Sequence, residues 1–242
     1  MLFFSAYLIN NTLHELSHAL TAYVLGVPST LYPFYVDVER VHASVAQQAW
    51  IGAAGPLCSL IVGAACWLVY TRARTTSRAL PFLYLATFGV SMFLGNLFSA
   101  SFVGDFSRAA TALNLPMAGR YGVTAAGALF LIAVMFVVGK ELLHWAPPQA
   151  SAMRAVVALV VSPVVVGTGC VLVAYLPMPA WYIVGLGMAS LFWIFAAVGV
   201  FTNAWRPRGG GQRDSIRWPD AALALVALAV VRGLRLGVPL VP

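Results

Sequence analysis

Two histidines and a glutamate stand close together in an apolar segment near the start of the chain, in the stretch His14-Glu15-Leu16-Ser17-His18. On a helix, side chains four residues apart lie on one face, so the two imidazoles can bind one metal ion. The Glu15 carboxylate is then placed to take a proton from metal-bound water. This HExxH spacing predicts His14 and His18 as zinc ligands and Glu15 as the catalytic base.

A catalytic zinc site has a third protein ligand and keeps its fourth position for water. Asp105 is the best candidate for that ligand, because it is one of only seven acidic residues and stands at the end of an apolar run. Its alternative role is to cap the helix expected to start at Phe106. Glu141, one turn from His144, is another possible third ligand, although this pair is also typical of anchors at a helix end.

Asn96 is an amide within an apolar run, where its side chain needs a hydrogen-bonding role. It can contact the backbone of a substrate, or it can join two helices.

The elements that must position these residues are membrane helices. The chain is 61% hydrophobic and 9% charged, with a mean hydropathy of +0.88, whereas soluble domains carry about 25% charged residues. The composition therefore predicts an all-α polytopic membrane protein, and the alternating segments of an outer-membrane barrel are not seen. The net charge of +7 comes from arginines in short loops. That pattern favours anchoring in a lipid bilayer over binding to nucleic acid.

Six apolar runs reach the length of about 20 residues that a membrane helix needs. They are residues 2–26, 49–71, 80–103, 121–144, 154–176 and 180–203. A seventh candidate, 219–239, is interrupted by Arg232 and Arg235, so it would either span or lie along the interface. The Gly- and Arg-rich residues 206–218 predict a flexible basic linker.

The connection between the first two runs, residues 27–48, contains prolines and an alternating pattern over 31–38. This pattern predicts a small β-hairpin in which residues 41–45 form the partner strand. A plain interfacial loop is the alternative.

Taken together, the HExxH stretch, the segment Ala54-Gly55-Pro56-Leu57 and the segment from Asn96 to Asp105 resemble the site-2 protease family of intramembrane zinc metalloproteases. The family pattern is HExxH on the first core helix, Gly-Pro at the opening of the second, and an Asn-to-Asp stretch on the third. The resemblance covers about residues 1–110, which it implies are a three-helix catalytic core. Residues 111–205 would then add further membrane helices, and 219–242 a seventh or interfacial helix.

By this likeness His14, His18 and Asp105 would bind one zinc ion, Glu15 would act as the base, and Asn96 would help to hold the substrate strand. The implied reaction is hydrolysis of peptide bonds in transmembrane segments of other membrane proteins, in a bacterial or archaeal cell membrane. Loop 27–48 would match the family's membrane-dipping β-hairpin. An added substrate strand would suit the reaction, because a helical peptide bond must be unwound before water can attack it.

Two other functions stay open. One is a membrane HExxH metalloprotease of another type that uses Glu141 as its third ligand. The other is a metal transporter or a non-catalytic metal-binding membrane protein, although the runs 154–176 and 180–203 offer almost no polar residues for a transport path. The orientation of the protein in the membrane also stays open. The positive-inside rule puts the N-terminus in the cytoplasm and loop 27–48 outside, whereas the resemblance implies the reverse.

Overall fold

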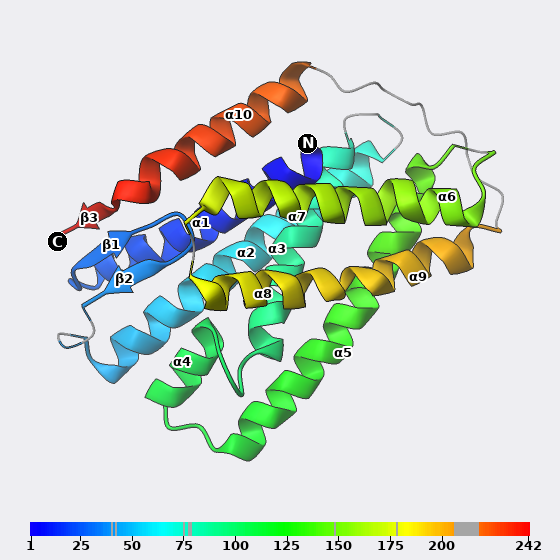
Figure 1. Ribbon diagram of the computed structural model, residues 1–242. Helices are drawn as coiled ribbons and strands as arrows, with labels where there is room; N and C mark the ends of the chain where they lie inside the picture. Colours follow the sequence, from blue (N-terminus) through cyan, green and yellow to red (C-terminus); the bar gives the residue numbers. More distant parts are fainter. Residues whose placement is uncertain are drawn as a thin grey trace.

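The computed structural model describes residues 1–39, 41, 43–74, 76, 79–147, 149–177, 179–205 and 218–242. It is mostly helical and has a small three-stranded sheet at one end (Figure 1). The strands are β1 (Ser29–Leu31), β2 (Val36–Val38) and β3 (Val238–Leu240). The α-helices are α1 (Leu2–Val24), α2 (Val45–Ala73), α3 (Leu80–Phe98), α4 (Asp105–Ala112), α5 (Met117–Leu142), α6 (Ala152–Val156), α7 (Ser162–Tyr175), α8 (Ala180–Leu191), α9 (Trp193–Asn203) and α10 (Trp218–Gly233).

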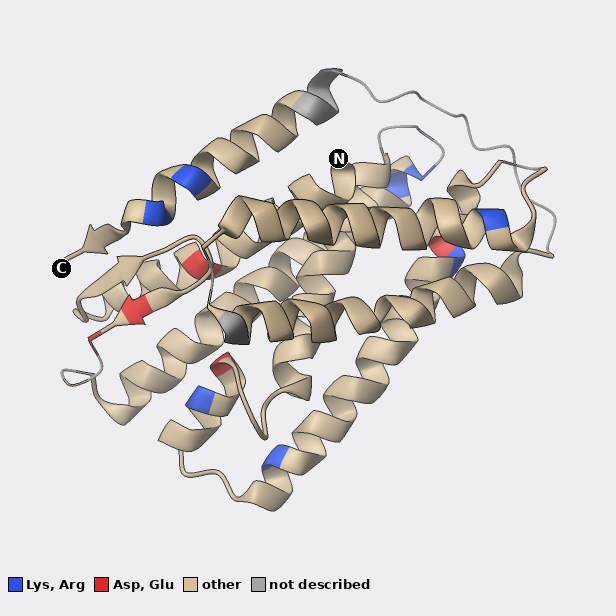
Figure 2. Cartoon of the chain, viewed as in Figure 1, with Lys and Arg blue, Asp and Glu red and all other residues tan. Residues whose placement is uncertain are grey.

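Five helical segments of the described chain are long and apolar enough to cross a membrane, which identifies an integral membrane protein. They are Val45–Ala73, Leu80–Phe98, Met117–Trp145, Ala152–Tyr175 and Tyr182–Asn203. Most of the coloured Lys, Arg, Asp and Glu residues lie near helix ends or in loops, as expected for such helices (Figure 2). Five of the six predicted spans thus correspond to helices that could cross a membrane.

The other two predicted spans are not confirmed. The run 2–26 forms the 23-residue helix α1, but α1 is not among the five because its asparagines, histidines and glutamate lower its hydropathy. The candidate 219–239 forms the 16-residue helix α10, which ends at Gly233. At about 1.5 Å of rise per residue this helix is shorter than the hydrocarbon core of a bilayer. The predicted linker, residues 206–218, lies outside the described residues except for Trp218.

Helix α1 lies inside the bundle, in contact with α2, α3, α7 and α10 (Figure 1). Its five polar side chains in the middle of the helix are buried to at least nine-tenths. They therefore face protein, where hydrogen-bonding partners can offset the cost of polar groups within a membrane. The helices around α1 therefore enclose the polar side chains that the sequence predicts to be catalytic.

The hairpin between α1 and α2 exists, but its predicted strand pairing was wrong. β1 pairs antiparallel with β2, and on its other side β1 pairs antiparallel with β3, so the order is β2-β1-β3. The predicted partner at 41–45 instead leads into α2. Ser44 accepts a hydrogen bond from the Gln47 amide, and the Gln47 side chain accepts one from the Ser44 amide. This capping box begins the helix at Val45. Arg40 and His42 lie outside the described residues.

The register of the sheet determines which way each strand presents its backbone. The β1–β2 ladder is flanked by hydrogen bonds from the Glu39 amide to the Pro28 carbonyl and from the Tyr32 amide to the Tyr35 carbonyl. Antiparallel pairs alternate between bonded and non-bonded, so Thr30 bonds to β2. The amide and carbonyl groups of the other two β1 residues, Ser29 and Leu31, then point toward β3.

The two outer edges of the sheet consequently differ. Val36 and Val38 of β2 point their amide and carbonyl groups away from β1, since their neighbour Asp37 pairs with Thr30. On β3 the outward-facing residue is Pro239, which pairs with Thr30 in register but has no amide hydrogen. Thus β2 offers both donors and acceptors at its outer edge, whereas β3 offers no donor at the middle of its outer edge.

Candidate metal centre

The side chains of His14, His18 and Asp105 meet between α1 and α4. Nε2 of His14 lies 3.2 Å from Nε2 of His18 and 3.1 Å from Oδ2 of Asp105, and Nε2 of His18 lies 3.4 Å from the same oxygen. Within the part of the chain that the structure describes, these residues form the one group of three or more such side chains that could hold a metal ion. The predicted ligand set is therefore brought together.

The spacing of the three donor atoms matches a small metal ion. Tetrahedral zinc has bonds of about 2.0–2.1 Å, which separate neighbouring ligand atoms by about 3.3 Å. The three observed separations, 3.1, 3.2 and 3.4 Å, bracket this value. A cation at the centre also balances the lone pairs that converge there, since two imidazole nitrogens and a carboxylate would otherwise repel one another.

The far nitrogens of both imidazoles have partners that orient the rings. Nδ1 of His18 donates to the Ile51 carbonyl at 2.5 Å, and Nδ1 of His14 lies 3.0 Å from the Ser59 hydroxyl. That hydroxyl donates towards the sulfur of Met92, which leaves its lone pairs for His14. A carbonyl only accepts, so the hydrogen of His18 is on Nδ1 and its Nε2 presents a lone pair to the centre. Sequence reasoning did not identify Ser59 or the Ile51 carbonyl.

The glycines of α2 make room for the centre. A Cβ atom on Gly55 would overlap Nε2 of His18 and lie 2.7 Å from Nε2 of His14. A Cβ atom on Gly52, one turn earlier, would lie 3.1 Å from the backbone oxygen of Asp105. The Gly-Pro segment noted in the sequence thus lets α2 lie directly against the metal ligands.

Asp105 is held by the chain around it. Its amide donates to Oδ1 of Asn96 at 3.1 Å, and Nδ2 of Asn96 donates to the Met92 carbonyl at 3.1 Å. Gly104 has a φ of +101°, and a Cβ atom there would lie 2.8 Å from the Ser99 hydroxyl oxygen. Asn96 therefore positions the loop that carries the ligand, while its contact with substrate stays a prediction.

The carboxyl group of Asp105 faces the histidines and makes no cap. It is the first residue of α4, and the helix has no side-chain cap hydrogen bond. Burial alone would raise the pKa of this carboxyl, but the imidazoles of His18 and His14 lower the pKa below its ordinary value. Arg108, whose NH1 lies 3.7 Å from Oδ1, is a positively charged neighbour of the same carboxyl group. Asp105 is thus a carboxylate near neutral pH, the form that binds a metal ion.

Glu15 is buried beside the cluster without belonging to it. Its side chain is 8% exposed, and its charge interacts with those of His14, His18 and Asp105. The metal-binding group does not include it. A carboxylate close to the centre but outside the ligand set is the position a general base requires, and this role stays a prediction.

Glu141, the alternative third ligand, has other partners. Its carboxylate lies 2.8 Å from NH2 of Arg74 and accepts a hydrogen bond of 2.9 Å from the Tyr70 hydroxyl. His144 lies 2.9 Å from the same guanidinium. These contacts join the ends of α2 and α5, and Glu141 is not a member of the metal-binding group. The group that could hold a metal ion therefore contains Asp105 and not Glu141.

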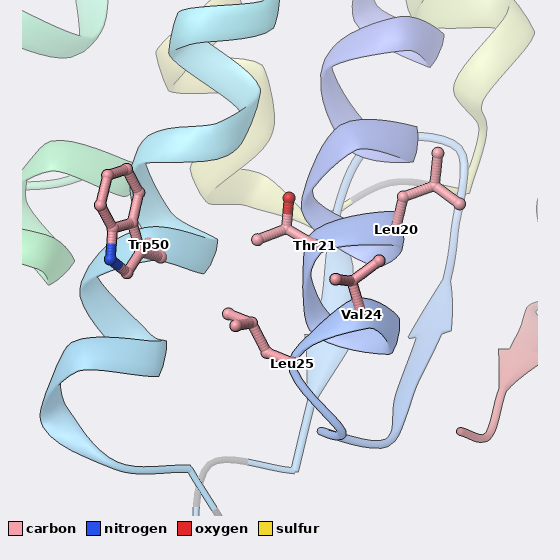
Figure 3. A pocket seen from close by; sticks show the side chains of 5 residues that line it. All are labelled: Leu20, Thr21, Val24, Leu25 and Trp50. Atoms are coloured by element: carbon pink, nitrogen blue, oxygen red, sulfur yellow. The ribbon is translucent and has the colours of Figure 1, made fainter.

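An open apolar groove of about 350 Å³ lies between the end of α1 and the start of α2 (Figure 3). It is lined by Leu20, Thr21, Val24, Leu25 and Trp50. Thr21 is one turn beyond His18, and Trp50 directly precedes Ile51, whose carbonyl holds the His18 ring. The groove was not predicted, because its lining comes from two separate segments of the chain.

The chain matches no protein-family model, no curated protein and no solved structure. Its functional interpretation rests on the residues of the centre and their geometry.

Proposed function

We propose that this protein is a zinc-dependent intramembrane endopeptidase that hydrolyses peptide bonds in transmembrane segments of other membrane proteins. The observation that carries the proposal is the triangle of Nε2, Nε2 and Oδ2 atoms at separations of 3.1–3.4 Å beside the buried Glu15. The resemblance of the same residues to the site-2 protease pattern supports it.

The donor set favours zinc. Two imidazole nitrogens and one carboxylate oxygen are ligands that catalytic zinc sites use, with a fourth position open for a reactant. The carbonyl that holds His18 and the hydroxyl beside His14 are typical outer partners of zinc-binding histidines.

The chemistry divides between the ion and the chain. A zinc ion held by His14, His18 and Asp105 would supply Lewis acidity that polarises the scissile carbonyl and makes water nucleophilic near neutral pH. Glu15 accepts the proton of the attacking water and then donates it to the leaving amine. Asp105, His14 and His18 hold the geometry, and the helices around α1 limit the access of bulk water, which strengthens electrostatic interactions there.

The outer edge of β2 suits an extended substrate. The outward amide and carbonyl groups of Val36 and Val38 can pair with a segment in β conformation, and a peptide bond in that conformation is free of helical hydrogen bonds. The hairpin that carries this edge directly follows α1 in the sequence, and both of its strands contact α1. The substrate segment would thereby be presented to Glu15 in unwound form.

The test uses the full-length protein in detergent. Metal analysis is expected to find one zinc ion per chain. A synthetic peptide with one apolar membrane-spanning segment, carrying a fluorophore and a quencher at its two ends, is expected to be cleaved. Glu15→Gln should retain zinc and lower kcat by about a hundredfold or more, the scale of a lost general base. Glu141→Gln, which changes a glutamate outside both the metal-binding group and the hairpin, is the control and should retain zinc and cleavage.

Two results would contradict the proposal. Purified protein without stoichiometric zinc would exclude the metal centre as proposed. Zinc at one ion per chain, together with cleavage that does not depend on Glu15, would leave a metal-binding membrane protein without the proposed activity.

A further inference from the structure

Asn11 is a buried amide on the same helix as the zinc motif. It lies three residues before His14 and four before Glu15, so it shares their face of α1 one turn closer to the start of the helix. Its side chain is 3% exposed. A buried amide is costly unless its hydrogens find acceptors.

Both acceptors of Asn11 come from other elements. Nδ2 donates to the Pro33 carbonyl at 2.9 Å and to the Tyr175 hydroxyl at 3.1 Å. Pro33 is in the turn between β1 and β2, and Tyr175 is the last residue of α7. One amide group therefore joins the helix of the metal ligands, the turn of the hairpin and a membrane-spanning helix.

Aromatic side chains also pack this turn against the bundle, but their contacts do not fix its position along the axis of α1. The ring of Phe34 lies 5.7 Å from that of Tyr175 and 5.1 Å from that of Tyr182, measured between centroids. Ring contacts of this kind tolerate sliding, whereas a hydrogen bond to a buried carbonyl is directional. The Asn11 bond to Pro33 thus sets the position of the turn relative to the zinc motif.

We propose that Asn11 is a positioning residue for substrate binding. By holding the Pro33 turn against α1, it keeps the outer edge of β2 at a constant place relative to Glu15 and the metal ligands. The hydrogen bonds of the Asn11 side chain go to Pro33 and Tyr175 and not to the metal-binding residues, so its contribution is to the placement of the substrate segment and not to the chemical step. This inference rests on the proposed function.

The kinetic test compares two buried asparagines. Asn11→Ala is expected to raise the KM for the labelled single-span peptide by about five- to tenfold, the scale of one lost buried hydrogen bond, with kcat and zinc content unchanged. Asn203→Ala is the matched control. Asn203 is also buried, but among the described residues its amide donates only within α9, to the Gly199 carbonyl and the Thr202 hydroxyl. Its removal should leave KM unchanged.

A second measurement needs no activity. In the zinc-loaded full chain, hydrogen exchange of the amides in residues 29–38 should be faster in Asn11→Ala than in the wild type, and unchanged in Asn203→Ala. Tyr175→Phe removes one acceptor and leaves the bond to Pro33, so it should accelerate exchange less. If Asn11→Ala does not fold, Asn11→Leu keeps the side-chain volume and removes the donor to the Pro33 carbonyl, and an unaltered exchange rate in folded Asn11→Leu contradicts the inference.

The outcomes separate this inference from the proposed function. Unchanged exchange and unchanged KM in a folded, zinc-bound Asn11→Ala protein would overturn the inference alone. A loss of zinc, or a lower kcat at constant KM, would assign Asn11 to the metal centre and also overturn it. An absence of Glu15-dependent cleavage would contradict the proposed function, while the exchange result would still decide whether Asn11 holds the hairpin.

Discussion

Gly55 of α2 and His18 of α1 lie so close together that a Cβ atom at position 55 would overlap Nε2 of the imidazole. The same Cβ would be 2.7 Å from Nε2 of His14. The space that glycine leaves therefore opens directly onto the two nitrogens that converge on the centre. A single methyl group at this position would compete with a metal ion.

Gly55→Ala is accordingly expected to weaken zinc binding by about tenfold or more, since overpacking at such a contact typically costs one to a few kcal/mol. Competition with a chromogenic chelator measures the affinity. Gly95→Ala is the control, because a Cβ atom on this glycine of α3 meets nothing within 4 Å. Equal affinities for the two variants would mean that the centre does not lie against α2 as described.

Asp105→Ala should abolish stoichiometric zinc binding, because it removes one of three ligands. Glu141→Gln should retain one zinc ion per chain and instead lower the free energy of unfolding by about 1–3 kcal/mol, between the ranges for exposed and buried ion pairs. Its partner Arg74 is 41% exposed, which keeps the effect below that of a fully buried pair. Metal analysis and denaturation in detergent measure the two effects. The reverse pattern would restore Glu141 as the third ligand.

Ser59→Ala removes the partner of Nδ1 of His14 and should weaken zinc binding by about 10–100-fold, the usual range for outer partners of metal-binding histidines. Ser91→Ala is a suitable control, since the Ser91 hydroxyl donates to the Phe88 carbonyl within α3. If both serine variants bind zinc equally well, the His14 ring is oriented by packing alone.

Gly237→Ala tests whether β3 holds β1. Gly237 has a φ of +77°, and a Cβ atom there would lie 2.8 Å from Cγ2 of Thr30. The substitution should therefore detach β3 and accelerate hydrogen exchange at the amides of Ser29 and Leu31. Gly233→Ala, at a glycine with open space around it, should leave that exchange unchanged. Identical exchange in both variants would show that β3 does not protect β1.

Local patterns predicted most of the centre. The spacing of His14 and His18 is a property of one helix, and the scarcity of acidic residues singled out Asp105. Ser59 was missed although a signal exists: Gly52, Gly55 and Ser59 repeat at intervals of three and four, which is one face of α2. The sequence therefore contained the small-residue face that meets the ligands.

Features that depend on distant parts of the chain were not predictable. β3 begins about two hundred residues after the β1 strand that it pairs with, and three-residue strands carry too little pattern to reveal a partner. Five of the predicted spans correspond to apolar helices of sufficient length, whereas α1, also predicted to span, has a lower hydropathy because its buried surroundings permit polar residues. High hydropathy indicates helices whose side chains face lipid, whereas the side chains of α1 mostly contact other helices.

Pro239 has a consequence for how copies of this chain meet in a crowded membrane. A sheet that can extend at both edges can join neighbours into open-ended ribbons. Here one edge has no amide hydrogen at its outward position, so edge-to-edge growth is limited to the β2 side. Each molecule is therefore expected to have one docking place for an extended segment, and a second molecule that occupies this place would act as a competitor.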